Sequence, residues 1–243
     1  MKKFNGFQLK IFMVILMLLD HISFIPGVVS STWKLIIHAV SRCVGVWFAY
    51  MAVEGILHTR SRVKYNLRLF ASAMIMFIGN MCLNFLFKSK GVYIYNNIFL
   101  TLSMGVLAIN IFCFEVEGIL KFLKLILGCL IGVLGLIFTE GGQIIIPFML
   151  ITYFLRNREI IRNILYVLYS ILILIFSYVS YDSLKETLLM LLYNSDWLFI
   201  LVIPFIYLYN GERGNNSKLS KYFFYVFYPL HLWIIKLIEF LVV

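Results

Sequence analysis

Long runs of apolar residues recur from the first tenth of the chain to its last residues, and they limit the possible folds more than any other feature. Of the 243 residues, 63% are hydrophobic and only 13% are charged. Soluble domains have about half apolar and a quarter charged residues, so a soluble fold could not bury this much apolar surface. A stretch of about 20 apolar residues crosses the hydrocarbon layer of a bilayer. The runs therefore predict membrane spans, which should be helical because backbone amides in lipid need internal partners.

We expect an all-α, polytopic transmembrane bundle of about nine helices, within a range of about eight to ten. The expected spans cover residues 7–27, 33–57, 66–87, 97–114, 121–138, 142–155, 160–179, 197–210 and 222–242. Residues 181–195 mix apolar and charged side chains, which favours a position along the membrane interface. The segments between the runs are too short for a soluble domain, so residues 1–243 are expected to form a single integral membrane domain.

The basic residues are distributed unevenly between the two sides that these spans would define. The formal net charge is +10, and fifteen of the 21 lysines and arginines fall on the side of the amino terminus, whereas four fall on the opposite side. Cytoplasmic loops carry an excess of basic residues, so the amino terminus is expected to be cytoplasmic. The expected partner of this charge is the lipid bilayer, and no nucleic-acid partner is expected. The cysteines and histidines have no metal-ligand spacing, so no metal site is expected.

Ionisable residues inside the spans are the main candidates for function, because each costs a few kcal/mol to place in lipid. At a rise of about 1.5 Å per residue, Asp20 and Arg42 lie roughly 10 and 13 Å inside the outer ends of the first two spans. These similar depths predict an ion pair between them. His21 follows Asp20 directly and can face the same cavity. His38 lies one turn before Arg42, nearer the outer surface, and we interpret it as an interfacial residue.

A second set of polar residues lies in the inner half of the second span and in the last span. Glu54 and His58 are four residues apart on one helix face, so the carboxylate can fix the tautomer of the imidazole and raise its basicity. In the last span, Tyr228 lies toward the inner face and His231 lies near mid-membrane. Together with Asp20, these residues predict a polar path from the inner face to the outer half of the membrane.

Such a path suits a reaction whose donor and acceptor arrive from opposite sides. A histidine tuned by a carboxylate can take the proton from an amine or hydroxyl as it attacks a thioester. Acyl-CoA would be the cytosolic thioester, and a basic cluster after the second span could bind its phosphates: Arg60, Arg62 and Arg68. The same cluster also fits a topology signal in contact with lipid headgroups. Asn97 and Thr101, four residues apart, are expected to form interhelical hydrogen bonds or to line the site.

The polar motifs occur in an order that resembles the TraX family of multi-span bacterial membrane proteins. The motifs are Asp20-His21, Glu54-Gly55-Ile56-Leu57-His58-Thr59 and Tyr228-Pro229-Leu230-His231, and the resemblance covers essentially the whole chain. The family takes its name from a conjugation protein that acetylates the amino terminus of pilin. It is similar in turn to the membrane acyltransferases of acyltransferase family 3, which have a histidine late in the first span, as His21 is here.

The resemblance implies a multi-pass protein of the bacterial plasma membrane that uses acetyl-CoA as co-substrate. The acetyl group would pass to an amine or hydroxyl of a peptide, protein or glycan acceptor, with His21 as the base and Asp20 and Arg42 balancing its charge. The chain departs from the family pattern at Gly45-Val46, where a Phe-Pro pair is typical. It departs again at Glu140, where an aspartate is expected.

Two other classes of protein fit the same buried acids and histidines. A transporter or proton-coupled permease would use them as a relay. A non-catalytic membrane component of a conjugation or secretion system would use them only to hold helices together. An enzyme predicts a closed pocket with a cytosolic mouth, and a transporter predicts two gates around one site. The sequence gives no indication of whether the protein self-associates.

Overall fold

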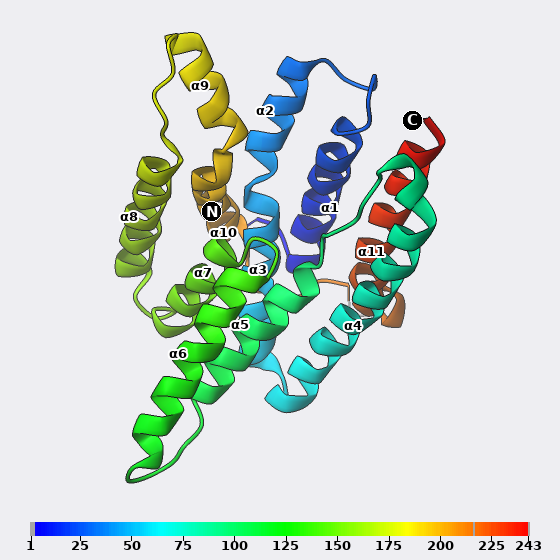
Figure 1. The fold of residues 1–243 in the computed structure, drawn as a ribbon. Helices are drawn as coiled ribbons and strands as arrows, with labels where there is room; N and C mark the ends of the chain where they lie inside the picture. The colour runs from blue at the N-terminus through cyan, green and yellow to red at the C-terminus, as the bar shows by residue number, and fades with distance from the viewer. Residues whose placement is uncertain (1–2, 216, 243) are drawn as a thin grey trace. The chain divides into compact units, whose positions relative to one another are not determined.

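The chain is folded entirely into helices and connecting loops over the described residues, 3–215 and 217–242 of a computed structural model (Figure 1). The all-α, polytopic membrane fold expected from the sequence is confirmed. Lys2, one of the basic residues counted for the orientation, lies outside the described residues. The elements are α1 (Gly6–Ser23), α2 (Ser31–Ser41), α3 (Cys43–His58), α4 (Arg62–Phe87), η1 (Lys88–Lys90), α5 (Ile98–Phe112), α6 (Leu120–Phe138), α7 (Gly142–Phe154), α8 (Glu159–Ser177), α9 (Leu184–Tyr193), η2 (Ser195–Leu201), α10 (Val202–Leu208) and α11 (Lys218–Val242).

Each of the nine expected spans corresponds to a helical segment, although not every segment is long enough to cross a bilayer alone. Among the described residues, six segments pass by length and hydropathy: α1, α2 with α3, α4 with η1, α6, α8 and α11. A seventh is added if α9 and the η2–α10 segment, bent by 61°, form one broken span. The helices α5 and α7 are shorter; α5 has 15 residues, about 22 Å. The count of nine crossings and the cytoplasmic amino terminus stay predictions.

Two compact units make up the chain. The first contains Met1–Trp47, Leu83–Ile94 and Asn163–Val243, and the second contains Phe48–Cys82 and Tyr95–Arg162. The single membrane domain expected over residues 1–243 stays a prediction.

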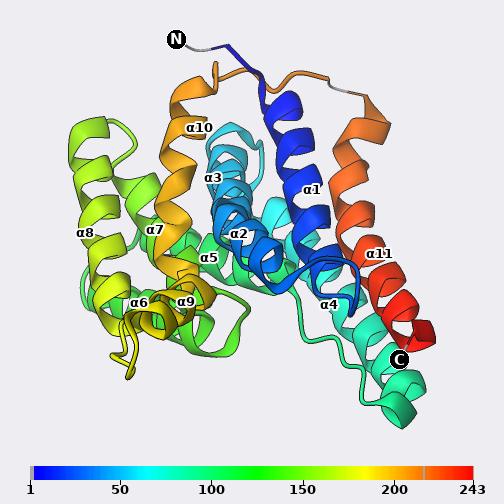
Figure 2. The same ribbon diagram turned by 90° about the horizontal axis from the view of Figure 1, so that it is seen from above.

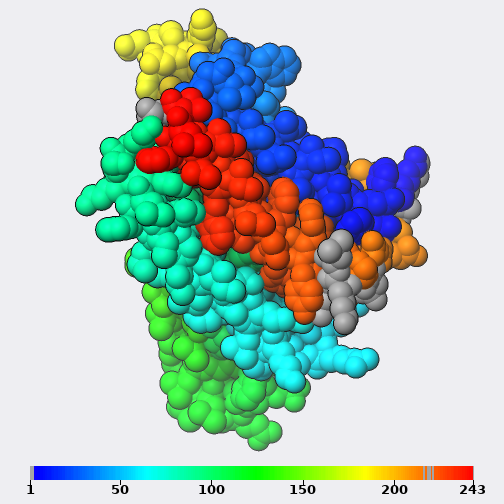
Figure 3. Space-filling view, turned by 90° about the vertical axis from the view of Figure 1, so that its right-hand side faces the viewer, coloured from blue at the N-terminus to red at the C-terminus, as the bar shows by residue number. Residues whose placement is uncertain are grey.

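In the first unit, α1 packs against α2 and α11, and α2 packs against α9 and η2. Figures 2 and 3 show α1 and α11 side by side. The helix α1 begins with a capping box, in which Asn5 and Gln8 each bind the other's backbone N–H and so satisfy two of the donors left open at a helix start. At the far end of α11, Phe240 stacks on Phe87 at 4.8 Å between ring centroids. These contacts fix the three helices that carry the buried acid and histidines.

In the second unit, α5, α6 and α7 pack against one another, and α5 and α6 run side by side in Figure 1. The turn between α6 and α7 needs glycine, because a Cβ on Gly142 would collide with the carbonyl oxygen of Gly135. Glu140 in this turn accepts hydrogen bonds from the side chain of Asn96 at 2.6 Å and from the backbone N–H of Asn97 at 2.5 Å. The carboxylate thereby fastens the turn to the start of α5.

Candidate functional site

The carboxylate of Asp20 is the centre of a polar cluster in the first unit. Only 7% of this residue is exposed, and its two oxygens have partners from a different helix. Oδ1 lies 3.2 Å from Nδ1 of His38, and Oδ2 lies 3.3 Å from Nη2 of Arg42. The ion pair expected between Asp20 and Arg42 is therefore confirmed, and His38 joins it.

Arg42 lies at the break between α2 and α3, and its guanidinium is held from three sides. Nε donates to the backbone carbonyl of His38 at 3.2 Å, and Nη1 donates to Oδ1 of Asp196 at 3.3 Å. The remaining contact is the one to Asp20. Because a guanidinium presents its N–H groups in a fixed fork, these contacts leave it little freedom to turn. Arg42 thus joins α1, α2 and the start of η2.

The carboxylate of Asp20 determines which nitrogen of His38 carries a proton. A carboxylate only accepts hydrogen bonds, so Nδ1 of His38 must donate to it. The guanidinium donates to the second oxygen, and Nη2 of Arg42 then lies 3.1 Å from Nδ1 of His38 because both donate to one carboxylate. In the neutral ring the lone pair is consequently on Nε2. This arrangement differs from the interfacial role expected of His38 from the sequence.

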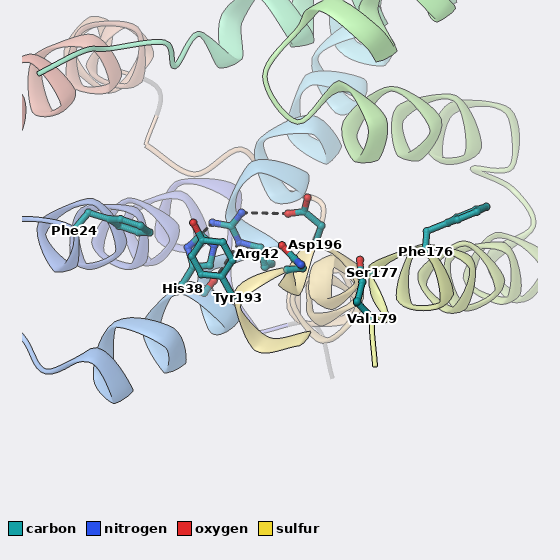
Figure 4. Close-up of a pocket in the computed structure, with 9 residues that line it drawn as sticks. Phe24, His38, Arg42, Phe176, Ser177, Val179, Tyr193 and Asp196 are labelled. Atoms are coloured by element: carbon teal, nitrogen blue, oxygen red, sulfur yellow. Dashed lines mark hydrogen bonds and ion pairs between the residues drawn. The ribbon is translucent and has the colours of Figure 1, made fainter. Parts of the chain in front are cut away.

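The cluster opens into a pocket of about 410 Å³ in the first unit, shown in Figure 4. His38, Arg42 and Asp196 line the pocket together with aromatic and small side chains: Phe24, Phe176, Ser177, Val179, Tyr193 and Asn194. The side chain of Asp196 is 60% exposed, whereas that of His38 is 17% exposed. The pocket therefore gives a small polar molecule access to an imidazole that is backed by a buried carboxylate.

His21 faces a different neighbour, His231 of α11. Nδ1 of His21 lies 3.2 Å from Nε2 of His231, and Nδ1 of His231 lies 3.0 Å from the carbonyl oxygen of Phe227. A carbonyl oxygen only accepts, so Nδ1 of His231 donates and its Nε2 accepts from Nδ1 of His21. The ring of Tyr228 lies 5.5 Å from that of His231. Of the polar path expected from the sequence, the contact between His21 and His231 is thus present within the first unit.

An apolar groove of about 780 Å³ follows α11 beside α1. His231 lines it, together with apolar and aromatic side chains: Leu18, Ile22, Tyr222, Phe223, Val226, Phe227, Leu230, Ile234, Ile235 and Ile238. The groove and the pocket have different linings. His231 is the histidine that lines the apolar groove, whereas His38 and Arg42, the two partners of Asp20, line the polar pocket.

The second unit holds Glu54 and His58, with less burial. Nδ1 of His58 lies 2.9 Å from the backbone carbonyl of Glu54 and 3.8 Å from its carboxylate, and the imidazole side chain is 74% exposed. Glu54 and His58 lie close together, as expected from their i to i+4 spacing, but the backbone carbonyl and not the carboxylate takes the hydrogen bond, and the pair lies at an exposed helix end.

The three arginines expected to bind a donor lie in the second unit and have different surroundings. Arg62 donates to the hydroxyl of Tyr153 at 2.9 Å. Arg68 lies over the ring of Tyr65, 5.7 Å from its centroid, and Arg60 is exposed. Arg156 lies on the ring of Tyr153 at 5.0 Å. Their role toward a phosphate-bearing donor stays a prediction.

Asn97 and Thr101 form the interhelical hydrogen bonds expected of them. The side chain of Asn97 donates to the carbonyl of Ala73 at 2.9 Å, and Thr101 Oγ1 donates to the carbonyl of Glu140 at 2.7 Å. Both residues belong to the framework of the second unit. No group of three or more potential metal ligands occurs in the part of the chain that the structure describes.

Sequence reasoning missed Asp196 and underestimated His38. His38 stands four residues before Arg42, and this spacing on one helix face was a usable signal. Asp196 is 154 residues from Arg42, and nothing in the sequence indicated that contact.

Comparisons with known proteins confirm the family that the sequence motifs resemble. The chain matches the family model described as TraX protein over residues 5–239. It is also similar to a protein of Dichelobacter nodosus named probable fimbrial assembly protein FimC, serogroup H1. The two sequences are 26% identical over 248 residues, which cover 94% of this chain and 93% of the relative. No solved structure matches the chain significantly. The wider likeness to acyltransferase family 3 stays a prediction.

Proposed function

The chain belongs to the TraX family, and on that premise we propose that it is a membrane-embedded acyltransferase. The observation that carries the proposal is the buried carboxylate of Asp20, which binds one imidazole and one guanidinium from a second apolar helix. An acid, a base and a fixed cation inside membrane helices are expensive to place there, and such residues usually mark a functional site. A pocket next to them supplies the space that a substrate needs.

The donor in this proposal is cytosolic acetyl-CoA. Its phosphates require cations, and the loop between α3 and α4 with the first two turns of α4 carries Arg60, Arg62 and Arg68. Arginine suits this task because its planar fork matches phosphate oxygens. The same loop can instead hold lipid headgroups, so the donor role needs a direct binding measurement.

The acceptor is an amine or hydroxyl of a protein or of another component of the bacterial envelope. The relative from Dichelobacter nodosus is named as a probable fimbrial assembly protein, and a fimbrial or pilus-type subunit is accordingly our first choice of acceptor. The location that goes with this activity is the plasma membrane of a bacterium.

The reaction requires two proton transfers and one exchange of bonds. The acceptor's N–H or O–H gives its proton to an imidazole of the cluster as its nitrogen or oxygen attacks the acetyl carbonyl carbon. A C–N or C–O bond forms, the C–S bond breaks, and CoA leaves as the thiol after taking up a proton. The guanidinium of Arg42 keeps the site near neutrality, because it balances the carboxylate of Asp20.

The test measures transfer of labelled acetyl from acetyl-CoA by the purified protein in lipid vesicles. The acceptor probe is a synthetic peptide with a free amino terminus and one serine, so that both kinds of acceptor group are present. The variant is Asp20→Asn, with Glu239→Gln as the matched control. Glu239 is also a carboxylate in an apolar helix that pairs with a cation, Lys236, at 2.8 Å, but it lies outside the cluster.

We expect the wild type and Glu239→Gln to label the peptide equally and Asp20→Asn to lose about 10²-fold or more in rate. Absence of labelling by the wild type with acetyl-CoA bound would contradict the proposal. Uptake of a solute into the vesicles without any acetyl transfer would support a transporter instead.

A further inference from the structure

We infer that His38, backed by Asp20, is the base that takes the proton from the acceptor, and that the pocket beside it is the acceptor site. This inference rests on the proposed acyl transfer. It assigns the proton transfer to the second helix of the chain, whereas the sequence directs attention to His21 of α1.

The two histidines differ in what holds their Nδ1 atoms. His38 donates from Nδ1 to the carboxylate of Asp20 at 3.2 Å, an anion that stabilises the positive charge the ring acquires when it takes a proton. His21 donates from Nδ1 to the neutral ring of His231, which offers no such charge. Because a carboxylate also locks the ring's orientation, the pairing with Asp20 suits a base, and the pairing with His231 suits a link between α1 and α11.

The two histidines also differ in their access to a polar molecule. His38 lines the pocket of about 410 Å³, whose rim carries the exposed carboxylate of Asp196. The groove on the side of His231 is lined almost wholly by hydrocarbon. An amine or hydroxyl reaching for a base would be solvated in the pocket and would lose its hydrogen bonds to water in the groove. Polarity therefore favours the pocket as the acceptor site.

The step at His38 balances with the co-substrate already named. For a hydroxyl or neutral amine acceptor, Nε2 of His38 accepts the proton of the acceptor group as the O–C or N–C bond to the acetyl carbon forms. The C–S bond of acetyl-CoA breaks, and the proton passes from Nε2 to the departing sulfur. Nδ1 of His38 keeps its proton throughout, because Asp20 accepts from it, and no oxidant or reductant is needed.

The test compares His38→Asn with His21→Asn, because an asparagine amide can replace the Nδ1 donor but not the Nε2 base. Each variant thereby keeps its hydrogen bond, to Asp20 or to His231, and loses only the opposite nitrogen. The readout is release of CoA thiol from acetyl-CoA in the presence of the same synthetic peptide. We expect about 10²- to 10⁴-fold loss for His38→Asn and a loss below about tenfold for His21→Asn.

A second measurement separates a chemical role from a structural one. His38→Ala opens space for a free imidazole, and added imidazole should restore part of the thiol release if His38 acts as a base. Glu239→Gln serves as the folding control, and the elution profile in detergent checks each variant. Rescue of His38→Ala, with none for His21→Ala, supports the inference.

The outcomes distinguish this inference from the proposed function. If the wild type is active, a His38→Asn variant with wild-type turnover overturns the inference and leaves acyl transfer standing. Loss of activity in His21→Asn with imidazole rescue of His21→Ala would assign the base to His21 instead. No thiol release by the wild type would overturn both proposals.

Discussion

Each of the two units contains a carboxylate that lies close to a histidine. The two units differ in how deeply the pair is buried and in how many helices contribute to it. In the first unit, Asp20 is buried and binds two donors from another helix. In the second unit, Glu54 and His58 belong to one helix, and the imidazole is mostly exposed. Convergence of separate helices, and not the residue types themselves, distinguishes a candidate catalytic site from an exposed helix end.

The largest expected difference between the units comes from removing each acid. Asp20→Asn removes the buried anion that Arg42 and His38 share and leaves Arg42 with the exposed Asp196 as its anionic partner; breaking such a buried pair costs about 3–5 kcal/mol. Glu54→Gln should cost below about 1 kcal/mol, because its partner His58 is mostly exposed and such pairs contribute little. Unfolding of the detergent-solubilised protein by increasing denaturing surfactant measures both. Equal losses would show that Glu54 is held as firmly as Asp20.

The next comparison exchanges an arginine for lysine in each unit. Arg42→Lys cannot reproduce the fork that bonds Asp20, Asp196 and a backbone carbonyl, so we expect at least about tenfold loss of acetyl transfer. Arg62→Lys keeps a cation near Tyr153 and should reduce the apparent affinity for acetyl-CoA more than the maximal rate. Titration of acetyl-CoA against transfer rate measures the two effects. The opposite pattern would place the donor at Arg42.

A smaller effect is expected where one side-chain hydrogen-bond acceptor is removed from each unit. His231→Phe removes the acceptor of His21, and Tyr153→Phe removes the hydroxyl that Arg62 binds. Each should lower stability by about 1–3 kcal/mol, because a donor loses its partner. Surfactant unfolding again reports the change. A neutral His231→Phe would mean that the histidine pair does not help to join α1 to α11.

The smallest effect is expected for His58→Gln in the second unit. Because the imidazole is exposed, the change in stability should stay within about 0.5 kcal/mol, and acetyl transfer should change less than about threefold. Parallel measurement with His38→Asn gives the contrast directly. If His58→Gln abolished transfer, the second unit would contain an essential part of the chemistry.

The sequence predicts the helical fold and much of the first-unit cluster because those features are periodic or local. Apolar runs define the helices, and the similar depths of Asp20 and Arg42 predict their ion pair. The short span 142–155 expected from the sequence matches α7, but the bend between α9 and η2 could not be predicted in the same way, since hydropathy reports the length of an apolar run and not helix geometry.

The misjudged residues are those whose partners come from distant segments. The depth of His38 along its helix predicts an interfacial position, whereas the neighbouring helix α1 supplies Asp20 as its partner. Asp196 approaches Arg42 only because α9 and η2 pack against α2. Tertiary packing determines such contacts, and a single sequence carries no periodic signal for them.

The most direct test of the account is a double-mutant cycle on acetyl transfer with Asp20→Asn, His38→Asn and the two changes combined. If carboxylate and imidazole act as one unit, the double variant should transfer acetyl at nearly the rate of the slower single variant, within about threefold. If the two losses multiply, Asp20 and His38 act independently, and the proposed acid-backed base is contradicted.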